Sequence, residues 1–156
     1  MTGGLEARRD AYELAVRALS RKERSTAELV NWLEQRNVDP ADIEMVIDRL
    51  TAIGELDDER FAQRFAEDKQ ELAGWGAERV RESLLARGVA SEHIEAALAA
   101  DSEKVQIDRA NDLLVRRGRA IDSEAEKTSA LGYLTRRGYS YEIAYEAIRS
   151  RTDKAA

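Results

Sequence analysis

The chain has 156 residues, with one proline, one histidine and no cysteine. These counts exclude disulfides, thiolate metal sites and cysteine nucleophiles. A single histidine also excludes paired-histidine zinc motifs and makes a serine–histidine–aspartate triad a poor candidate. Hydrophobic residues make up 43% of the chain, too many for a disordered polyelectrolyte. We therefore expect a folded protein with a modest core.

The chain carries 25 basic and 31 acidic residues, a net charge of −6. A dedicated non-specific DNA-binding protein usually has the opposite sign, because its affinity comes from releasing counterions from phosphates. The longest apolar run, Ala96–Ala100, is far shorter than the roughly 20 residues that a membrane span needs. The polar N-terminus shows no secretory signal. We expect a cytoplasmic protein with no membrane partner.

Apolar residues recur at spacings of three or four along the whole chain, which predicts amphipathic helices, and no sustained alternation predicts a strand. Helix starts are marked by Asp57 as an N-cap and by the capping boxes Ser25–Glu28 and Ser123–Glu126. The predicted helices cover residues 6–20, 26–36, 40–52, 58–72, 77–87, 92–99, 103–117, 124–137 and 141–151.

The sequence contains a repeat of about 50 residues. Leu33, Leu84 and Leu134 occupy the same position in three segments that align without gaps. These segments are Glu28–Ile47, Arg79–Leu98 and Ser129–Ile148.

Each segment contains the signals of a corner between two helices. Four residues after the shared leucine stands a residue type that tolerates the left-handed conformation at a helix C-terminus, preceded by arginine and followed by an apolar residue. These left-handed positions are Asn37, Gly88 and Gly138. A new N-cap is predicted after each corner, at Asp39, Ser91 and Ser140.

The fold class that follows is all-α, with three tandem three-helix repeats of about 50 residues. Each repeat has a thin core, so neighbours should stack into an elongated, curved array. The predicted core includes Leu14, Leu19 and Leu72. The predicted repeats are residues 1–53, 54–100 and 101–156, with frayed ends at Met1–Glu6 and Thr152–Ala156.

The sequence announces no catalytic or cofactor site, since it has no phosphate-binding glycine motif. The densest acidic run, Leu56–Glu59, could bind Mg²⁺ or act in acid–base chemistry. Capping of a helix start is the favoured interpretation. His93 has no second ligand nearby in the sequence and is interpreted as a surface residue. We expect no metal, no cofactor and no catalytic residue.

Basic residues are unevenly placed. Residues 51–100 have a net charge of −5, whereas residues 1–50 have −2 and residues 101–156 have +1. The basic clusters could be helix C-termini and solvated faces, or could contact phosphate or an acidic protein surface. For the first cluster the solvated-face interpretation is slightly favoured, and for the second the two are balanced. The clusters are Arg21, Lys22 and Arg24, then Arg116, Arg117, Arg119, Arg136 and Arg137.

Several stretches together resemble the RecX regulatory proteins of bacteria. The most specific is Leu56–Ala62 (LDDERFA), supported by Ala18–Ser25, Gly88-Val89 and Leu134–Ser140. The likeness runs from about Ala18 to Arg149. One departure is Asn37, where glycine is the more usual corner residue.

The resemblance implies a non-enzymatic protein that binds the RecA recombinase, free and as a filament on single-stranded DNA. It implies inhibition of recombinase, ATPase and coprotease activity, and so modulation of DNA repair and the SOS response. It also implies a bacterial cytoplasmic location and the curved three-repeat fold. We expect a monomer whose eight clustered basic residues contact the filament, with possible weak direct contact to DNA. Two alternatives stay open: a direct nucleic-acid-binding helical-repeat protein, and a general protein-interaction scaffold.

Overall fold

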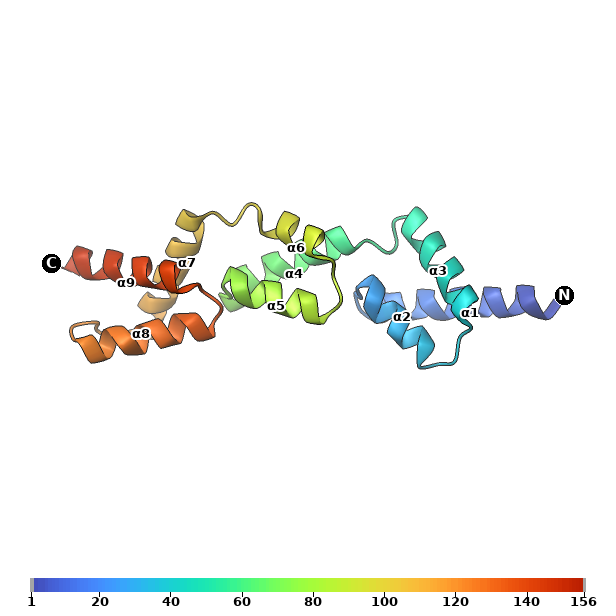
Figure 1. Ribbon diagram of the computed structural model, residues 1–156, viewed down its shortest axis with the longest axis horizontal. Helices are drawn as coiled ribbons and strands as arrows, with labels where there is room; N and C mark the ends of the chain where they lie inside the picture. Colours follow the sequence, from blue (N-terminus) through green and yellow to red (C-terminus); the bar gives the residue numbers. More distant parts are fainter. Residues whose placement is uncertain (1, 156) are drawn as a thin grey trace. The chain divides into compact units, whose positions relative to one another are not determined.

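The computed structural model describes residues 2–155, with side chains described from Gly3 to Asp153. All regular secondary structure among them is helical (Figure 1). The helices are α1 (Thr2–Arg21), α2 (Thr26–Glu34), α3 (Pro40–Ala52), α4 (Asp58–Ala73), α5 (Ala77–Ala86), α6 (Ser91–Leu98), α7 (Glu103–Arg117), α8 (Glu124–Arg136) and α9 (Tyr141–Ala155).

The predicted all-α class and each predicted helix are confirmed, with differences mainly at the two ends of the chain. Helix α1 already begins at Thr2, and α9 continues to Ala155. The expected fraying of Met1 and Ala156 concerns residues outside the described range. The rest of the predicted frayed ends is helical.

The chain forms two compact units. Unit 1 consists of the chain up to residue 62 together with residues 84–94, and unit 2 consists of residues 63–83 together with the chain from residue 95 onward. The division into repeats at residues 53 and 100, and the elongated, curved form, stay predictions.

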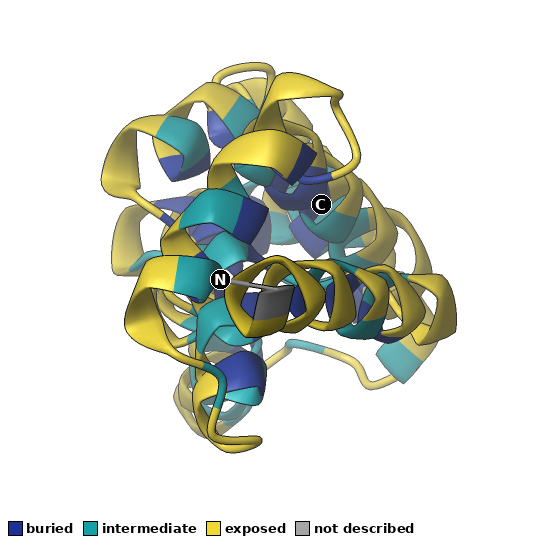
Figure 2. Ribbon diagram, turned by 90° about the vertical axis from the view of Figure 1, so that its right-hand side faces the viewer, coloured by how far each residue is buried: buried dark blue, intermediate teal, exposed yellow. Residues whose placement is uncertain are grey.

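The core of unit 1 is built by residues of α1, α2 and α3 together with Leu56. Figure 2 colours the ribbon by burial, and single helices carry both buried and exposed residues. Helix α1 contributes Ala11, Ala15 and Ala18, because small residues three or four positions apart let helices approach closely. The predicted core residues Leu14 and Leu19 are only half-buried beside them. The larger core residues of unit 1 are Leu29, Leu33, Ile43, Val46, Leu50 and Leu56.

In unit 2 the corresponding core is formed by α7, α8 and α9. Leu134 is fully buried at its centre, and Tyr139 is buried as the corner residue that follows α8. The prediction for Leu72 is wrong: its side chain is 82% exposed, because this position of α4 lies on the outward side of the helix. The remaining core residues are Ala110, Leu113, Leu114, Ala130, Ile143, Ala144, Ala147 and Ile148.

The three predicted corners are confirmed as Schellman caps. Asn37, Gly88 and Gly138 have positive φ angles of 58°, 78° and 97°. The residue after each donates its backbone N–H to the carbonyl of the shared leucine, at 3.1–3.2 Å. This six-to-one bond is the signature of the motif.

The predicted N-cap at Ser91 is wrong by one residue. Helix α6 begins at Ser91, and the carbonyl of Ala90 accepts the N–H groups of His93 and Ile94 at 3.0 and 3.2 Å. Ala90 stands six residues after the shared leucine, as Asp39 and Ser140 do. The helix therefore begins at the same position in every repeat, even though the serine next to Ala90 is a better N-cap residue.

A joint of the same design occurs once in each unit. In unit 1 the start of α2 lies against the α5–α6 corner, where the Ser25 hydroxyl donates to the Arg87 carbonyl at 2.6 Å. In unit 2 the start of α5 lies against the α8–α9 corner, where the Gly76 N–H donates to the Arg137 carbonyl at 2.8 Å. Ser25 and Gly76 each stand eight residues before the shared leucine, so the joint follows the repeat.

The acidic run serves the unit 1 joint and the start of α4. Asp57 accepts the N–H of Arg60 at 3.1 Å and caps the helix. Asp58 accepts both the N–H and the hydroxyl of Thr26, at 2.8 and 3.0 Å. Asp57 therefore caps α4 as predicted, whereas the bonds from Asp58 to the start of α2 were not predicted from the sequence.

Candidate partner-binding surface

The first basic cluster follows the end of α1. Arg21 and Lys22 are exposed, and within the described part of the chain neither makes a hydrogen bond or ion pair. Arg24 is half-buried, donates to the Ala18 carbonyl at 3.3 Å and lies 5.5 Å from the Trp32 ring. Two of the three cations are thus available to a partner, whereas the third supports the turn into α2.

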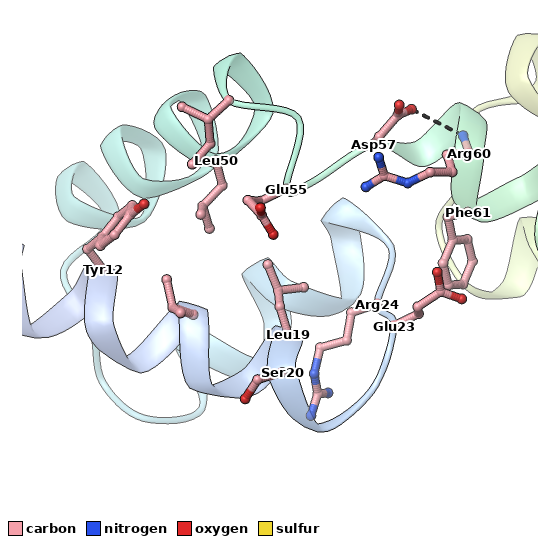
Figure 3. A pocket seen from close by; sticks show the side chains of 12 residues that line it. Tyr12, Leu19, Ser20, Glu23, Arg24, Leu50, Glu55, Asp57, Arg60 and Phe61 are labelled. Atoms are coloured by element: carbon pink, nitrogen blue, oxygen red, sulfur yellow. Dashed lines mark hydrogen bonds between the residues drawn. The ribbon is translucent and has the colours of Figure 1, made fainter.

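Arg24 also lines a cleft of about 460 Å³ between α1, α3 and the start of α4 (Figure 3). Half of the residues in this lining are apolar or aromatic, and two of them, Val16 and Ile53, are 42% and 58% exposed. The dashed line in Figure 3 marks the Asp57–Arg60 bond that caps α4. The exposed apolar side chains give the cleft a surface on which an apolar side chain can pack.

The second basic cluster begins at the end of α7. Arg117 donates to the Ser129 hydroxyl at 2.6 Å, and Arg119 donates to Glu126 at 3.0 Å, so both are held by α8. Arg116 is exposed and has no recorded bond among the described residues.

At the other end of α8, Arg137 lies 3.7 Å from the Tyr133 ring and donates to the Tyr133 carbonyl at 3.4 Å. Arg117 approaches the same ring at 5.0 Å. The structure therefore brings Arg117 and Arg137 together around one tyrosine. Arg136 is exposed, lies beside Gly132, and makes no hydrogen bond or ion pair with the residues that the structure describes.

The second predicted capping box is only half formed. The Ser123 hydroxyl accepts the N–H of Glu126 at 3.2 Å, but the Glu126 carboxylate points to Arg119 instead of the Ser123 N–H. The Ser25–Glu28 box is complete, and Glu28 is also held by Arg87 at 3.0 Å.

The sequence analysis missed the stacking of arginine on the aromatic residue one turn earlier. Arg36 lies 3.4 Å from the Trp32 ring, as Arg137 does over Tyr133. The signal was an aromatic residue four positions before the corner arginine, a spacing that places both on one helix face.

A buried ion pair in unit 2 was also missed. Arg109 makes three hydrogen bonds of 2.8–3.0 Å to Asp101, whose side chain is 4% exposed. Burial raises the pKa of the Asp101 carboxyl, and the neighbouring guanidinium opposes that rise. Arg109 also donates to the Tyr139 hydroxyl, which in turn donates to the Gly74 carbonyl at 2.8 Å. Burial raises the Tyr139 pKa as well.

His93 is half-buried, and its Nε2 atom lies 3.8 Å from Oε1 of Glu92. It is the one histidine of the sequence. Within the residues that the structure describes, no group of three or more His, Asp or Glu side chains is close enough to hold a metal ion. Among these residues, no helix is both long and apolar enough to cross a bilayer.

Sequence comparison places this chain beside one family along most of its length. Residues 11–50 match the model of the first three-helix domain of RecX, and residues 57–98 match that of the second. The regulatory protein RecX of Mycobacterium sp. strain KMS is 33% identical over 145 residues, covering 88% of this chain and 79% of the relative. That of Deinococcus radiodurans is 34% identical over 145 residues, covering 92% and 69%.

A comparison of structures agrees at the level of the fold. The crystal structure of RecX from Lactobacillus salivarius has a TM-score of 0.86, with 19% identity, and covers 94% of this chain and 97% of that one. A second RecX crystal structure has a TM-score of 0.84, with 22% identity, and covers 95% and 75%.

Proposed function

Since this chain belongs to the RecX family of regulatory proteins, we propose that it acts without catalysis, by binding RecA and its filament on single-stranded DNA. In doing so it inhibits the recombinase, ATPase and coprotease activities of RecA. The observation that carries the proposal is the family match, which spans about nine-tenths of the chain.

The structure narrows the residues through which such binding would work. Of the eight clustered cations, only Arg21, Lys22, Arg116 and Arg136 are exposed and make no bond within the described residues. A free cation meets a partner carboxylate or phosphate without first breaking an internal contact. We therefore propose these four as the partner-binding set.

The direct experiment measures ATP hydrolysis by RecA on single-stranded DNA with this protein in sub-stoichiometric amounts. We expect inhibition, and hydrolysis at the uninhibited rate would contradict the proposal. The double variant Arg116→Glu with Arg136→Glu should raise the concentration for half-inhibition by about tenfold, since each reversal removes an attraction and adds a repulsion.

A matched control distinguishes the loss of these particular cations from a general effect of net charge. Arg17 and Lys104 are exposed cations outside the proposed set, without a recorded side-chain bond among the described residues. Arg17→Glu with Lys104→Glu changes the net charge equally and should leave inhibition near the parent value. An equal loss of inhibition in both double variants would show that Arg116 and Arg136 do not belong to the site.

Direct binding to DNA is the second candidate, favoured only by the four free cations. It predicts affinity for single-stranded DNA without RecA, falling steeply as salt rises. The net charge of −6 opposes it as the main activity. A flat binding curve in fluorescence anisotropy at low salt would refute this second candidate.

A further inference from the structure

Unit 2 contains a hollow of about 550 Å³ bordered by α4, α6 and α7. The apolar part of its lining consists of small residues after α4 and in α6 and its end, together with Leu113 and Val105, whose side chain is 46% exposed. Small lining residues allow another backbone to come close, and an exposed valine offers a contact for a partner. The small residues are Gly74, Ala96, Ala97 and Ala100.

Two pairs of acidic residues border this hollow from different helices. Glu67 and Glu71 stand one helical turn apart on α4, and Asp108 and Asp112 stand one turn apart on α7. All four are exposed, and none has a hydrogen bond or ion pair in the part of the chain that the structure describes. Residues at this spacing share a helix face, about 6 Å apart.

The cations in the same lining do not neutralise these carboxylates. Arg109 is held by the buried Asp101 through three hydrogen bonds, which leaves Arg116 as the remaining guanidinium in the lining. Five carboxylates thus face two guanidinium groups, an excess of three negative charges around an apolar lining. Asp101 also accepts a hydrogen bond from Gln70 of α4 at 3.0 Å, which ties the start of α7 to α4 beside the hollow.

A single metal ion does not fit this arrangement. Nowhere among the described residues do three acidic or histidine side chains converge closely enough to hold one. The charges instead lie in two rows, each with the one-turn spacing of a helix. A matching ligand is itself extended and carries several positive charges.

We propose that this acidic hollow docks a helix of a partner protein that presents lysine or arginine side chains one turn apart. The ammonium or guanidinium groups meet the four free carboxylates, while the aliphatic stems pack against Val105 and the alanines. A nucleic acid backbone is repelled by the same charges. This surface goes beyond the proposed function, since it holds whether or not RecA is the partner.

The test uses the purified full chain and a fluorescein-labelled alanine-based peptide of about 16 residues, long enough to be helical, with lysine at every fourth position. Fluorescence anisotropy at low salt should show binding that weakens as salt rises. A peptide of the same composition with its lysines consecutive should bind more weakly. Absence of binding, or equal binding of both peptides, overturns the proposal.

Variants then locate the site. Glu71→Lys with Asp108→Lys should weaken peptide binding by about tenfold, since two attractions become repulsions. Glu44→Lys with Asp48→Lys is the matched control: these residues are exposed, one turn apart on α3 in unit 1, and change the net charge equally. Equal weakening by the control shows a general charge effect and refutes the hollow as the site.

Arg116 supplies a test in the opposite direction. It lies in the lining of the acidic hollow and repels a basic ligand there, so Arg116→Glu should tighten peptide binding by several-fold. A variant that merely disturbed the fold would not gain affinity. Unchanged or weaker binding contradicts the proposal.

Discussion

Arginine side chains in this protein serve two different purposes, although the sequence places them in the same clusters. Arg117, Arg119 and Arg137 are held by α8 through hydrogen bonds and ring contacts. Arg116 and Arg136, their direct neighbours in the chain, point to solvent. Adjacent residues on a helix are about 100° apart, so one faces the molecule when the next faces away.

Replacing Arg137 and Arg136 by alanine should separate these purposes. Arg137→Ala removes the contact with the Tyr133 ring and the bond to its carbonyl, and should lower the free energy of unfolding by about 1 kcal/mol. Arg136→Ala should change it by less than about 0.5 kcal/mol. Urea unfolding measures both, and an equal loss would contradict the assignment.

Glu28 links its own helix cap to the neighbouring corner and makes stability depend on pH. Burial alone would raise its pKa, but hydrogen bonds from the Ser25 N–H and from Arg87, with the charge of Arg87, lower it below the ordinary value of 4.5. A carboxyl whose pKa is lower in the folded state than in the unfolded state stabilises the fold fully when the pH is above the unfolded-state pKa. That stabilisation is lost as the pH falls through the folded-state pKa.

Glu28→Gln should therefore be less stable than the parent at neutral pH, by about 1 kcal/mol, because a glutamine can still close the capping box but loses the charge that pairs with Arg87. The difference should shrink as the pH falls below about 4.5, where the parent loses the same charge. Urea unfolding between neutral and acidic pH measures this convergence. Parallel stability curves would show that the carboxylate charge is not involved.

At the scale of the elements, the two joints explain which corners need glycine. A Cβ added at Gly88 would overlap Ala27 at the start of α2, and one added at Gly138 would overlap Arg79 at the start of α5. Asn37 also has a positive φ, but among the described residues the carbonyl of Arg36 before it accepts no hydrogen bond from a helix start, unlike the carbonyls of Arg87 and Arg137. Asparagine tolerates the left-handed conformation that this corner needs.

Gly54 and Gly88 offer a matched pair for testing this explanation. Both have φ of 78°, but nothing lies within 4 Å of a Cβ at Gly54. Gly54→Ala should lower the free energy of unfolding by about 1–2 kcal/mol, because alanine must adopt the left-handed conformation. Gly88→Ala should lower it by at least about 1 kcal/mol more, because the joint must also shift. Equal losses of stability in urea unfolding would refute the close contact.

At the scale of the whole molecule, the negative net charge takes on a definite meaning. Part of the acidic excess closes helix starts and joints, as Asp57, Asp58 and Glu28 do. Another part borders the hollow between α4, α6 and α7, where the four exposed carboxylates make no hydrogen bond or ion pair among the described residues. Arg116, one of the four free cations, lies in the same lining, so the hollow keeps an excess of negative charge and is not uniformly acidic.

The helices and corners of the described residues could be predicted from the sequence because their causes are local. A cap, a left-handed residue and an apolar period act over three to six residues, and all of these are visible in the chain. The same physics explains the errors. Ser91 looked like a cap and Leu72 like a core residue by type, but position in the register decided both.

The candidate site was predictable only as a set of residue types. The clustering of eight cations is visible in the chain, whereas the tertiary structure decided that four of them are free. It also decided that Asp101 and Arg109 form a buried pair beside a hollow, and that Ser25 reaches Arg87, 62 residues away. Those outcomes depend on which distant groups meet in space. Local spacing determines the elements, and their packing determines which charges remain for a partner.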